Sequence, residues 1–262
     1  MTSPSVITSR DNPLLKELRK LSGDNTAYRK LGRCWVEGDH LCSAALDRGW
    51  KPALALFSES FWPAAPAQYA QEAIKSVVVK DMLWREISGL ESPAHVGFVL
   101  EVPVPSHLLP NAPTVILDRV QDAGNVGSIL RSAGAFGFRQ VLALTGTAAL
   151  WSPKVLRAAM GAHFGLQLHE GLTLQALDAL QVSVVVTSSH QGDLLQNLRL
   201  PCPCAWAFGH EGQGVSEELM ARAALFARIG QPGGEESLNV AAAAAICLHA
   251  SSSDRMAEQR PL

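Results

Sequence analysis

The chain contains 262 residues, of which 47% are hydrophobic and 18% are charged, and its formal net charge is −2 at pH 7. At roughly 150 residues per domain this length favours two domains, and the composition excludes a disordered, collagen-like or coiled-coil chain. The longest wholly apolar run, residues 240–248, is less than half of the ~20 residues that span a bilayer, and the N-terminus does not resemble a secretory signal. We therefore expect a cytoplasmic protein with no membrane partner.

The first predicted helix begins at Asn12-Pro13 and carries leucines on one face and basic side chains on the other. Residues 1–33 contain seven basic side chains against three acidic ones, although the chain as a whole is slightly acidic. Taken alone, this charge favours a solvent-facing helix surface over a nucleic-acid site.

A small α/β domain is predicted for the first part of the chain. It contains a second helix at 38–48 and strands at 53–57, 76–79 and 96–102. Residues 102–113 then contain four prolines, a residue type disfavoured inside helices and central strands. We therefore predict a first domain at 1–102, a linker at 103–113, a second domain at 114–250 and a flexible polar tail at 251–262.

The second domain is predicted to be a parallel sheet covered by helices on both faces. Its predicted strands are 114–117, 140–144, 183–187, 205–208 and 225–229. Its predicted helices are 126–136, 153–160, 172–180, 216–223 and 236–249. In such sheets ligands bind beyond the carboxyl ends of the strands, so the loops after residues 117, 187, 208 and 229 are expected to form the site.

The first of these loops, 118–131, places Asn125 and Gly127 at a helix start and Arg131 one turn further on. A helix start offers backbone N–H groups to a phosphate, and an arginine adds bidentate charge. The alternative interpretation is a glycine turn followed by a surface arginine.

The second loop, 208–214, contains three glycines around Glu211. Glu211 could orient a substrate, accept a hydrogen bond from a ligand amine, or cap the helix that starts near Ser216. His210 could act as a general base, although a histidine beside a turn is more often a surface or hydrogen-bonded residue.

The third loop ends in Ser237 and Asn239, which precede five alanines at 241–245. Ser and Asn are common helix caps, and the alanines allow a close neighbour against the helix. The pair Cys202-Pro-Cys204 lacks the spacing and the second pair typical of zinc sites, so we expect free thiols and no metal site, with Cys204 starting a buried strand.

Together, three ordered motifs resemble those of the SpoU (TrmH-like) RNA 2′-O-ribose methyltransferases of the SPOUT superfamily. They are Asn125-x-Gly-x-x-x-Arg131, Phe208-Gly-His-Glu-Gly-x-Gly214 and Ser237-Leu-Asn-Val240, and the likeness covers about residues 113–250, including 153–164. The opening Ile7-Thr-Ser-Arg-Asp-Asn12 with Lys16, and Val36-Glu-Gly38, are similar to the substrate-binding domain of the ribosomal-RNA members.

The resemblance implies a small ribosomal-protein-like α/β domain followed by a parallel-sheet α/β domain with a trefoil knot, S-adenosylmethionine as cofactor, and a homodimer. The catalytic residues that it implies are Asn125, Arg131, Glu211, Ser237 and Asn239. The cofactor-binding residues are Thr187, Gly209, Ile229, Leu238 and Asn239, and the RNA-binding residues are Arg10, Lys16, Arg19, Lys20 and Arg157. In this family Arg131 would activate the ribose hydroxyl, either as a base or by gripping a phosphate.

The sequence departs from the family pattern at Ala123, His210 and Ala241, where many members have Pro, Asn and a small hydroxyl residue. None of these changes removes a residue assigned to catalysis. Ribosomal RNA (23S) is the expected substrate, with transfer RNA as the alternative, and a noncatalytic RNA-binding protein of the same fold is the rival from another class. A nicotinamide oxidoreductase lacks support, because the glycine fingerprint and the acidic ribose ligand are missing.

Overall fold

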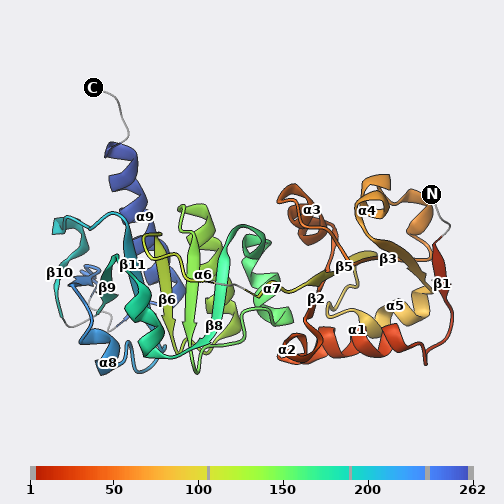
Figure 1. Cartoon of the computed structure of the whole chain (residues 1–262), viewed down its shortest axis with the longest axis horizontal. Coiled ribbons are helices and arrows are strands. Elements are labelled where there is room, and N and C mark those ends of the chain that lie inside the picture. Colours follow the sequence, from red (N-terminus) through yellow and green to blue (C-terminus); the bar gives the residue numbers. More distant parts are fainter. Residues whose placement is uncertain (1–3, 105–106, 189–190, 234–236, 259–262) are drawn as a thin grey trace. The chain divides into compact units, whose positions relative to one another are not determined.

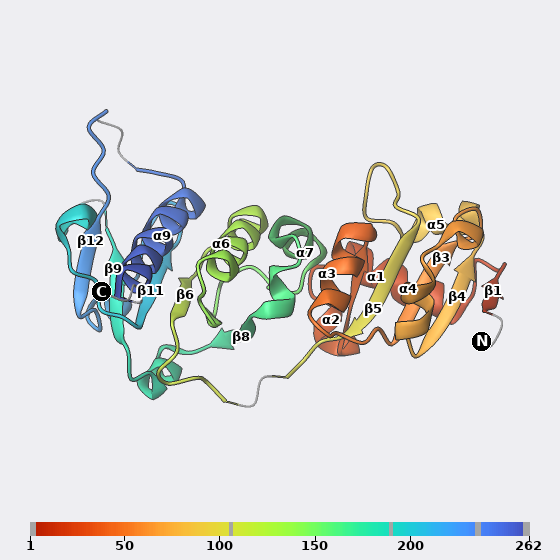
Figure 2. The ribbon, with the colours of Figure 1, turned by 90° about the horizontal axis from the view of Figure 1, so that it is seen from above.

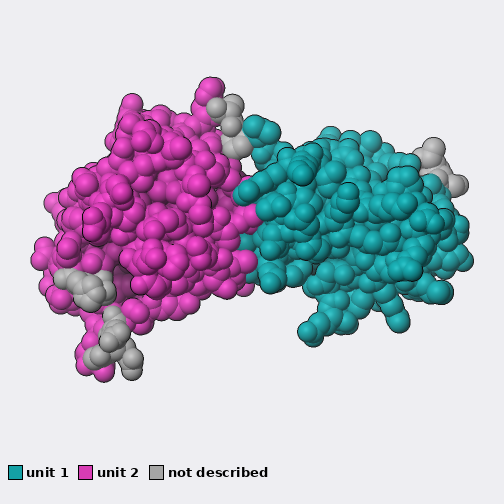
Figure 3. Space-filling view, turned by 90° about the horizontal axis from the view of Figure 1, so that it is seen from below, with its two compact units in different colours: residues 1–104, 151–164 teal, residues 105–150, 165–262 magenta. Residues whose placement is uncertain are grey.

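The computed structural model describes residues 4–104, 107–188, 191–233 and 237–258 (Figure 1). The chain divides into two compact units, coloured separately in Figure 3: Met1–Val104 with Trp151–Phe164, and Pro105–Leu150 with Gly165–Leu262. The sequence predicted one linker between the two domains, at 103–113. It did not predict that residues 151–164, which follow this linker, belong to the first unit. Among the described residues, no helix has the length and apolar character needed to cross a membrane.

The first unit contains a five-stranded mixed sheet. Its strands, in spatial order, are β1 (Ser5–Ile7), β4 (Lys75–Val79), β3 (Leu54–Ser58), β5 (Val96–Glu101) and β2 (Arg33–Glu37). Its helices are α1 (Pro13–Gly23), α2 (Ala27–Leu31), α3 (Asp39–Asp47), α4 (Ala67–Glu72), α5 (Asp81–Ile87) and α7 (Pro153–Ala159). Strands β3, β4 and β5 were predicted, whereas the three-residue β1 and the five-residue β2 were missed.

Helix α1 forms where the sequence predicted it. The side chain of Asn12 accepts a hydrogen bond from the Leu14 amide at 2.9 Å, and Pro13 occupies the first turn, where its missing N–H costs nothing. Leu15, Leu18 and Leu21 are buried, so the leucine face of the helix packs on the core.

Residues 151–164 are bound into the first unit by aromatic packing. The indole N–H of Trp50 donates to the Phe164 carbonyl at 3.1 Å, and the Trp50 ring lies 5.2 Å from the Phe164 ring and 5.9 Å from the Trp151 ring between centroids. Within this segment, the Ser152 hydroxyl caps α7 by accepting from the Val155 amide. The first unit therefore includes a part of the sequence that follows the predicted linker.

The second unit contains a seven-stranded sheet in which every described pairing is parallel. Its strands, in spatial order, are β10 (Asp193–Leu194), β12 (Leu225–Arg228), β9 (Ser183–Thr187), β11 (Cys204–Gly209), β6 (Thr114–Asp118), β7 (Gln140–Leu144) and β8 (Gln167–Leu172). The five predicted strands are confirmed, and Cys204 begins β11 as expected. Strands β8 and β10 lie at the two edges and lack the continuous apolar run that identified the others.

The helices of the second unit differ from prediction mainly at their ends. They are α6 (Ala123–Ala135), α8 (Glu217–Met220) and α9 (Val240–Glu258), and residues 174–179 form a 3-10 helix. Helix α9 continues nine residues past its predicted end at 249, so the predicted tail is wrong up to Glu258, and residues 259–262 lie outside the described chain. At the start of this extension Ser251 is buried, and its hydroxyl accepts from the Trp206 indole at 2.7 Å, so this part of the predicted tail packs on β11.

The strand order positions the site. Strand β11 lies between β9 and β6, and Gly209 is in register with Asp118, so their carboxyl ends share one edge. The chain leaves β6 towards β7 on one side and leaves β11 towards β12 on the other, while α6 and α9 pack together on one face (Figure 2). A crevice forms where successive connections diverge in this way.

Candidate active site at the strand ends

Glu211 links the loop after β11 to the start of α6. Its carboxylate accepts hydrogen bonds from the amides of Gln121 at 3.2 Å and Asp122 at 3.1 Å, and from the Asn125 side-chain amide at 3.0 Å. The suggestion that Glu211 caps the helix near Ser216 is therefore wrong, because the Ser216 amide instead donates to Asp118 at 2.6 Å.

The pKa of Glu211 lies below its ordinary value. Partial burial pushes the pKa upwards, but the hydrogen bonds from Asn125, Asp122 and Gln121 together outweigh that effect by stabilising the ionised form. A carboxylate that already accepts three N–H groups is a weak base, so this geometry suits positioning better than proton abstraction.

Asn239 extends the network to the third loop. Its side-chain amide donates to the Asn125 side-chain oxygen at 2.9 Å, and its own side-chain oxygen accepts from the amides of Ala241 at 2.9 Å and Ala242 at 3.3 Å. Asn239 is thus both the cap of α9 and a partner of Asn125. We call Glu211, Asn125 and Asn239 the three-loop relay.

The first turn of α6 is only partly capped from within the chain. Asp122 accepts from the Asn125 amide at 2.8 Å, and the amides of Gln121 and Asp122, just before the helix, bind Glu211. Within the described part of the chain, the amides of Ala123 and Gly124 have no hydrogen-bond acceptor, so the predicted free N–H groups are confirmed at these two positions. The sequence signal for this cap was Asp three residues before Asn125, which also explains why the helix begins earlier than predicted. Among the described residues, Arg131 is exposed and has no hydrogen-bond or ion-pair partner.

His210 is a hydrogen-bonded turn residue. Its Nδ1 atom accepts from the amides of Gly212 at 3.0 Å and Gln213 at 3.2 Å, and its backbone pairs with Gly214. This bonding occupies Nδ1 and favours the structural interpretation over a general base. Ser237 is exposed beside the relay residue Asn239.

The residues predicted to bind the cofactor lie at the carboxyl ends of β9 and β11 and on the segment between β12 and α9. The Thr187 hydroxyl donates to the Ala207 carbonyl at 3.2 Å, so its side chain links β9 to β11. A Cβ atom on Gly209 would lie 2.1 Å from the Gly214 carbonyl carbon, so the returning loop itself requires this glycine. Ile229 is half-buried and Leu238 is 39% exposed, which leaves apolar surface uncovered.

Two polar atoms at the end of β12 and on the loop after it fit a small cofactor with hydrogen-bonding groups. Among the described residues, the Arg228 Nε–H donor and the Gln231 side-chain oxygen are buried without a hydrogen-bond partner. Buried unsatisfied groups are costly and normally find water or a ligand. A donor, an acceptor and the exposed Leu238 provide the polar and apolar contacts that a nucleoside needs.

The predicted RNA-binding residues at the N-terminus fall into two groups. Arg10 and Arg19 bind one carboxylate of Glu86, at 3.0 Å and 2.7 Å, and Arg19 also donates to the Arg10 carbonyl. Lys16 lies 3.4 Å from Asp11 and is mostly exposed, and Lys20 is exposed on the same helix. The lysines are therefore the accessible cations of this group.

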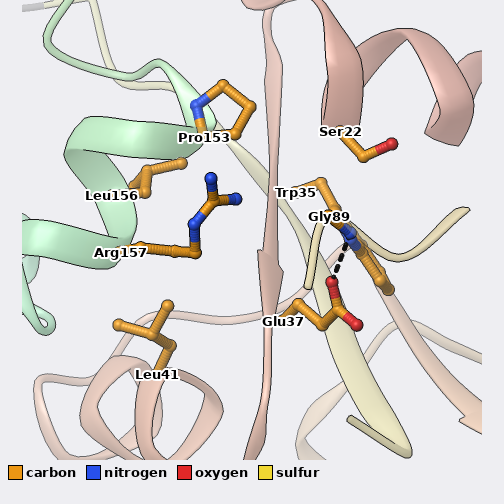
Figure 4. Close-up of a pocket in the computed structure, with 8 residues that line it drawn as sticks. All are labelled: Ser22, Trp35, Glu37, Leu41, Gly89, Pro153, Leu156 and Arg157. Atoms are coloured by element: carbon orange, nitrogen blue, oxygen red, sulfur yellow. Dashed lines mark hydrogen bonds between the residues drawn. The ribbon is translucent and has the colours of Figure 1, made fainter. Parts of the chain in front are cut away.

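Arg157 lies in a pocket of the first unit, where its guanidinium points towards β2 (Figure 4). The pocket is lined by Ser22, Trp35, Glu37, Leu41, Gly89, Pro153, Leu156 and Arg157. The Glu37 carboxylate already accepts from the Ser88 hydroxyl at 2.6 Å and the Gly89 amide at 2.9 Å. This half-buried position indicates packing by Arg157 more than an exposed RNA contact.

Comparison with known proteins assigns both parts of the chain. The SpoU rRNA Methylase family model matches residues 112–249, and the MRM3-like substrate binding domain model matches residues 12–97. The chain is 28% identical to the Bacillus subtilis 23S rRNA (guanosine(2553)-2′-O)-methyltransferase RlmP over 93% of this chain and 97% of that one. It is 30% identical to the Coxiella burnetii 23S rRNA (guanosine-2′-O-)-methyltransferase RlmB over 82% and 93%.

The structure supports the same grouping. It superposes on the AdoMet-bound rRNA methyltransferase from Sinorhizobium meliloti with a TM-score of 0.82 and 27% identity, covering 95% of this chain and 97% of that one. Residues 112–249, which the family model matches, contain all three loops of the relay. The chain belongs to the SpoU rRNA Methylase family.

Proposed function

We propose that this protein transfers a methyl group from S-adenosylmethionine to a ribose 2′-OH of 23S-type ribosomal RNA. The observation that carries the proposal is the three-loop relay, in which Asn125 bonds both Glu211 and Asn239 across three strand-end loops. These residues come from the three motifs that resemble the family, and the relay orders the loops in the crevice of the sheet.

Residues at the ends of β9 and β11 and after β12 would hold the cofactor. We assign its adenosine to the backbone of Thr187, Gly209 and Ile229 and to the exposed side chain of Leu238, with Asn239 at the edge. The buried, unpaired atoms of Arg228 and Gln231 offer the polar contacts there. When bound, S-adenosylmethionine supplies a methyl group on a sulfonium, which is reactive towards an oxygen nucleophile.

The chain must then orient the ribose hydroxyl so that a new C–O bond would form as the methyl–sulfur bond breaks, with the hydroxyl proton released to solvent. Glu211 is a positioning group, because its three hydrogen bonds lower its pKa. We assign Arg131 to the RNA phosphate beside the target ribose, where its charge lowers the pKa of the hydroxyl. Removing a proton from a guanidinium is costly, so Arg131 itself is a poor base, although it remains the alternative proton acceptor in the bound complex. Ser237 and Asn239 would shape the substrate side.

The relatives and the domain matched in the first unit support ribosomal RNA as the substrate class. The RlmP and RlmB relatives, which match 93% and 82% of the chain, are both named as 23S rRNA enzymes, and the matched substrate-binding domain covers residues 12–97. Transfer RNA is the second candidate, and Lys16 and Lys20 would contact phosphates in either case. Action on ribosomal RNA is consistent with a cytoplasmic location.

We also propose a homodimer and a trefoil knot in the second unit. Helix α9 leaves Ile246 42% exposed one turn after the exposed Ala242, which gives an apolar strip for a second copy. The insertion of β11 between β9 and β6, followed by the packing of α9 on α6, supports the knot. Light scattering of the wild type and of Ile246→Glu would test the dimer, and a monomeric wild type would refute it.

The direct test is methyl transfer. The purified chain should transfer label from S-adenosylmethionine to rRNA of a strain lacking the gene, and mapping of 2′-O-methyl groups should reveal one restored position. A chain that binds this RNA but gives no cofactor isotherm in calorimetry would instead be a noncatalytic RNA-binding protein. Labelling of tRNA and not of rRNA would select the second substrate.

A further inference from the structure

Arg119 has a backbone conformation that residues other than glycine rarely adopt. Its φ is +61°, and it is one of two non-glycine residues with positive φ among those the structure describes. The residue directly follows β6 and precedes the amides that bind Glu211. Such conformations persist only where the surroundings over-determine them, and they cluster at functional sites.

The contacts of Arg119 join three strand-end loops. Its amide donates to the Thr147 hydroxyl at 3.1 Å, and a Cβ atom on Gly146 would lie 3.1 Å from the Arg119 Cγ, so the aliphatic part covers the loop after β7. Its Nε donates to Asp118 at 3.1 Å, and a terminal nitrogen donates to the Gln213 side-chain oxygen at 2.9 Å.

These bonds hold the Glu211 loop at a second point. Glu211 attaches the loop to residues 121–125, and Gln213, two residues later, attaches it to Arg119. The buried Asp118 adds a third link, because it accepts from both Arg119 and the Ser216 amide. A loop held at one point can rotate about it, whereas a loop held at several points cannot.

We infer that Arg119 is a positioning residue for methyl transfer: through Gln213 it fixes the loop that carries Glu211 before any ligand binds. This inference rests on the proposed function for its kinetic consequence, but not for its structural one. Arg119 acts through Gln213 and Glu211 and is not assigned to the reacting atoms. Gln213 is exposed, so its side chain can be changed with little effect on the core.

The first experiment compares Gln213→Ala, Gln213→Glu and the control Gln175→Ala, an exposed glutamine on the 3-10 helix at 174–179. In single-turnover methylation by the full chain, Gln213→Ala should be roughly tenfold slower at saturating RNA, because small misplacements of catalytic groups are costly. The KM for RNA and the Tm should stay unchanged. Gln213→Glu should keep the wild-type rate, since a carboxylate accepts more strongly from arginine. A wild-type rate in Gln213→Ala, or equal losses in both variants, overturns the inference.

The second experiment needs no activity. Amide hydrogen exchange at Gln121 and Asp122, whose acceptor is Glu211, should become several-fold faster in Gln213→Ala and stay unchanged in Gln175→Ala. Unchanged exchange in Gln213→Ala would refute the positioning role. If the wild type transfers no methyl group, the proposed function fails, while this exchange result still decides the role of Arg119. In an Arg119→Ala background, Gln213→Ala should add nothing; should that background fail to fold, the Gln213 variants decide alone.

Discussion

The Glu211 carboxylate accepts a hydrogen bond from the Asn125 side chain at 3.0 Å, although 86 residues separate the two in the sequence. Both residues follow strands that are neighbours in the sheet, β11 and β6, and Asn239 joins them from a third loop. The relay therefore depends on strand order. Its effects on stability and on catalysis can be tested with different variants.

Glu211→Gln should lower stability at neutral pH by about 1 kcal/mol, a figure that allows for solvent screening of an exposed charge. The folded-state pKa of Glu211 is below its ordinary 4.5, so ionisation stabilises the fold above that value. This contribution is lost as the pH falls through the lowered pKa. Urea unfolding of both proteins should show a difference at pH 7 that disappears in acid, and a constant difference across this range would contradict the assignment.

Asn239 allows the helix cap to be separated from the relay. Asn239→Asp keeps an oxygen for the amides of Ala241 and Ala242, but replaces the donor to Asn125 with a second oxygen. It should keep the contribution of the helix cap to stability and lose at least about tenfold in methyl transfer. Asn239→Ala should lose activity and, in addition, about 1 kcal/mol of stability. Full activity in Asn239→Asp would show that the hydrogen bond between Asn239 and Asn125 is not needed for methyl transfer.

Arg131→Ala should abolish most methyl transfer while leaving the affinity for S-adenosylmethionine unchanged. The reason is that Arg131 is exposed and unpaired among the described residues, and is assigned to the RNA. Arg131→Lys should rescue poorly, because lysine lacks the planar fork that grips a phosphate. Single-turnover assays at saturating RNA, with calorimetry as the control, test both variants. Near-normal transfer by Arg131→Ala would place hydroxyl activation elsewhere.

Lys16→Ala combined with Lys20→Ala should weaken RNA binding and flatten its salt dependence. Removal of one lysine–phosphate interaction should reduce the slope of log affinity against log salt concentration by about 0.7 to 0.9, because fewer counterions are then released on binding. Arg10 and Arg19 are less suitable targets than the sequence suggested, because both are bound to Glu86. Lys75→Ala, an exposed lysine of β4, is the matched control. An unchanged slope in the double variant would show that the lysines of α1 face solvent and do not contact RNA.

Trp50→Ala should lower the free energy of unfolding by about 2 to 4 kcal/mol, since it removes the ring contacts that bind residues 151–164. Trp50→Phe should cost less, because it keeps an aromatic ring and loses mainly the hydrogen bond to Phe164. Denaturant titration measures both. Equal losses in the two variants would show that the hydrogen bond, and not the packing, anchors the segment.

The sequence alone determined the features that depend on local pattern. Residue type and spacing were enough to predict the leucine face and Asn12 cap of α1, five of the strands of the second unit, and the three motifs with Asn125, Glu211 and Asn239. Apolar runs and caps are local physical signals, so they survive without knowledge of the fold. Edge strands such as β8, and the full length of α9, were missed because they depend on neighbours distant in the sequence.

Only the tertiary structure decided what these residues contact. Whether Glu211 caps a following helix or binds the start of α6 depends on β11 lying beside β6, which no local pattern specifies. The same holds for Arg119, whose role arises from Gly146, Thr147 and Gln213 on other loops. Residues 151–164 follow the predicted linker, yet they pack in the first unit because Trp50 offers a partner there. Long-range hydrogen bonds and aromatic packing carry no periodic signal along the chain, and so they became visible only once the fold had brought their partners together.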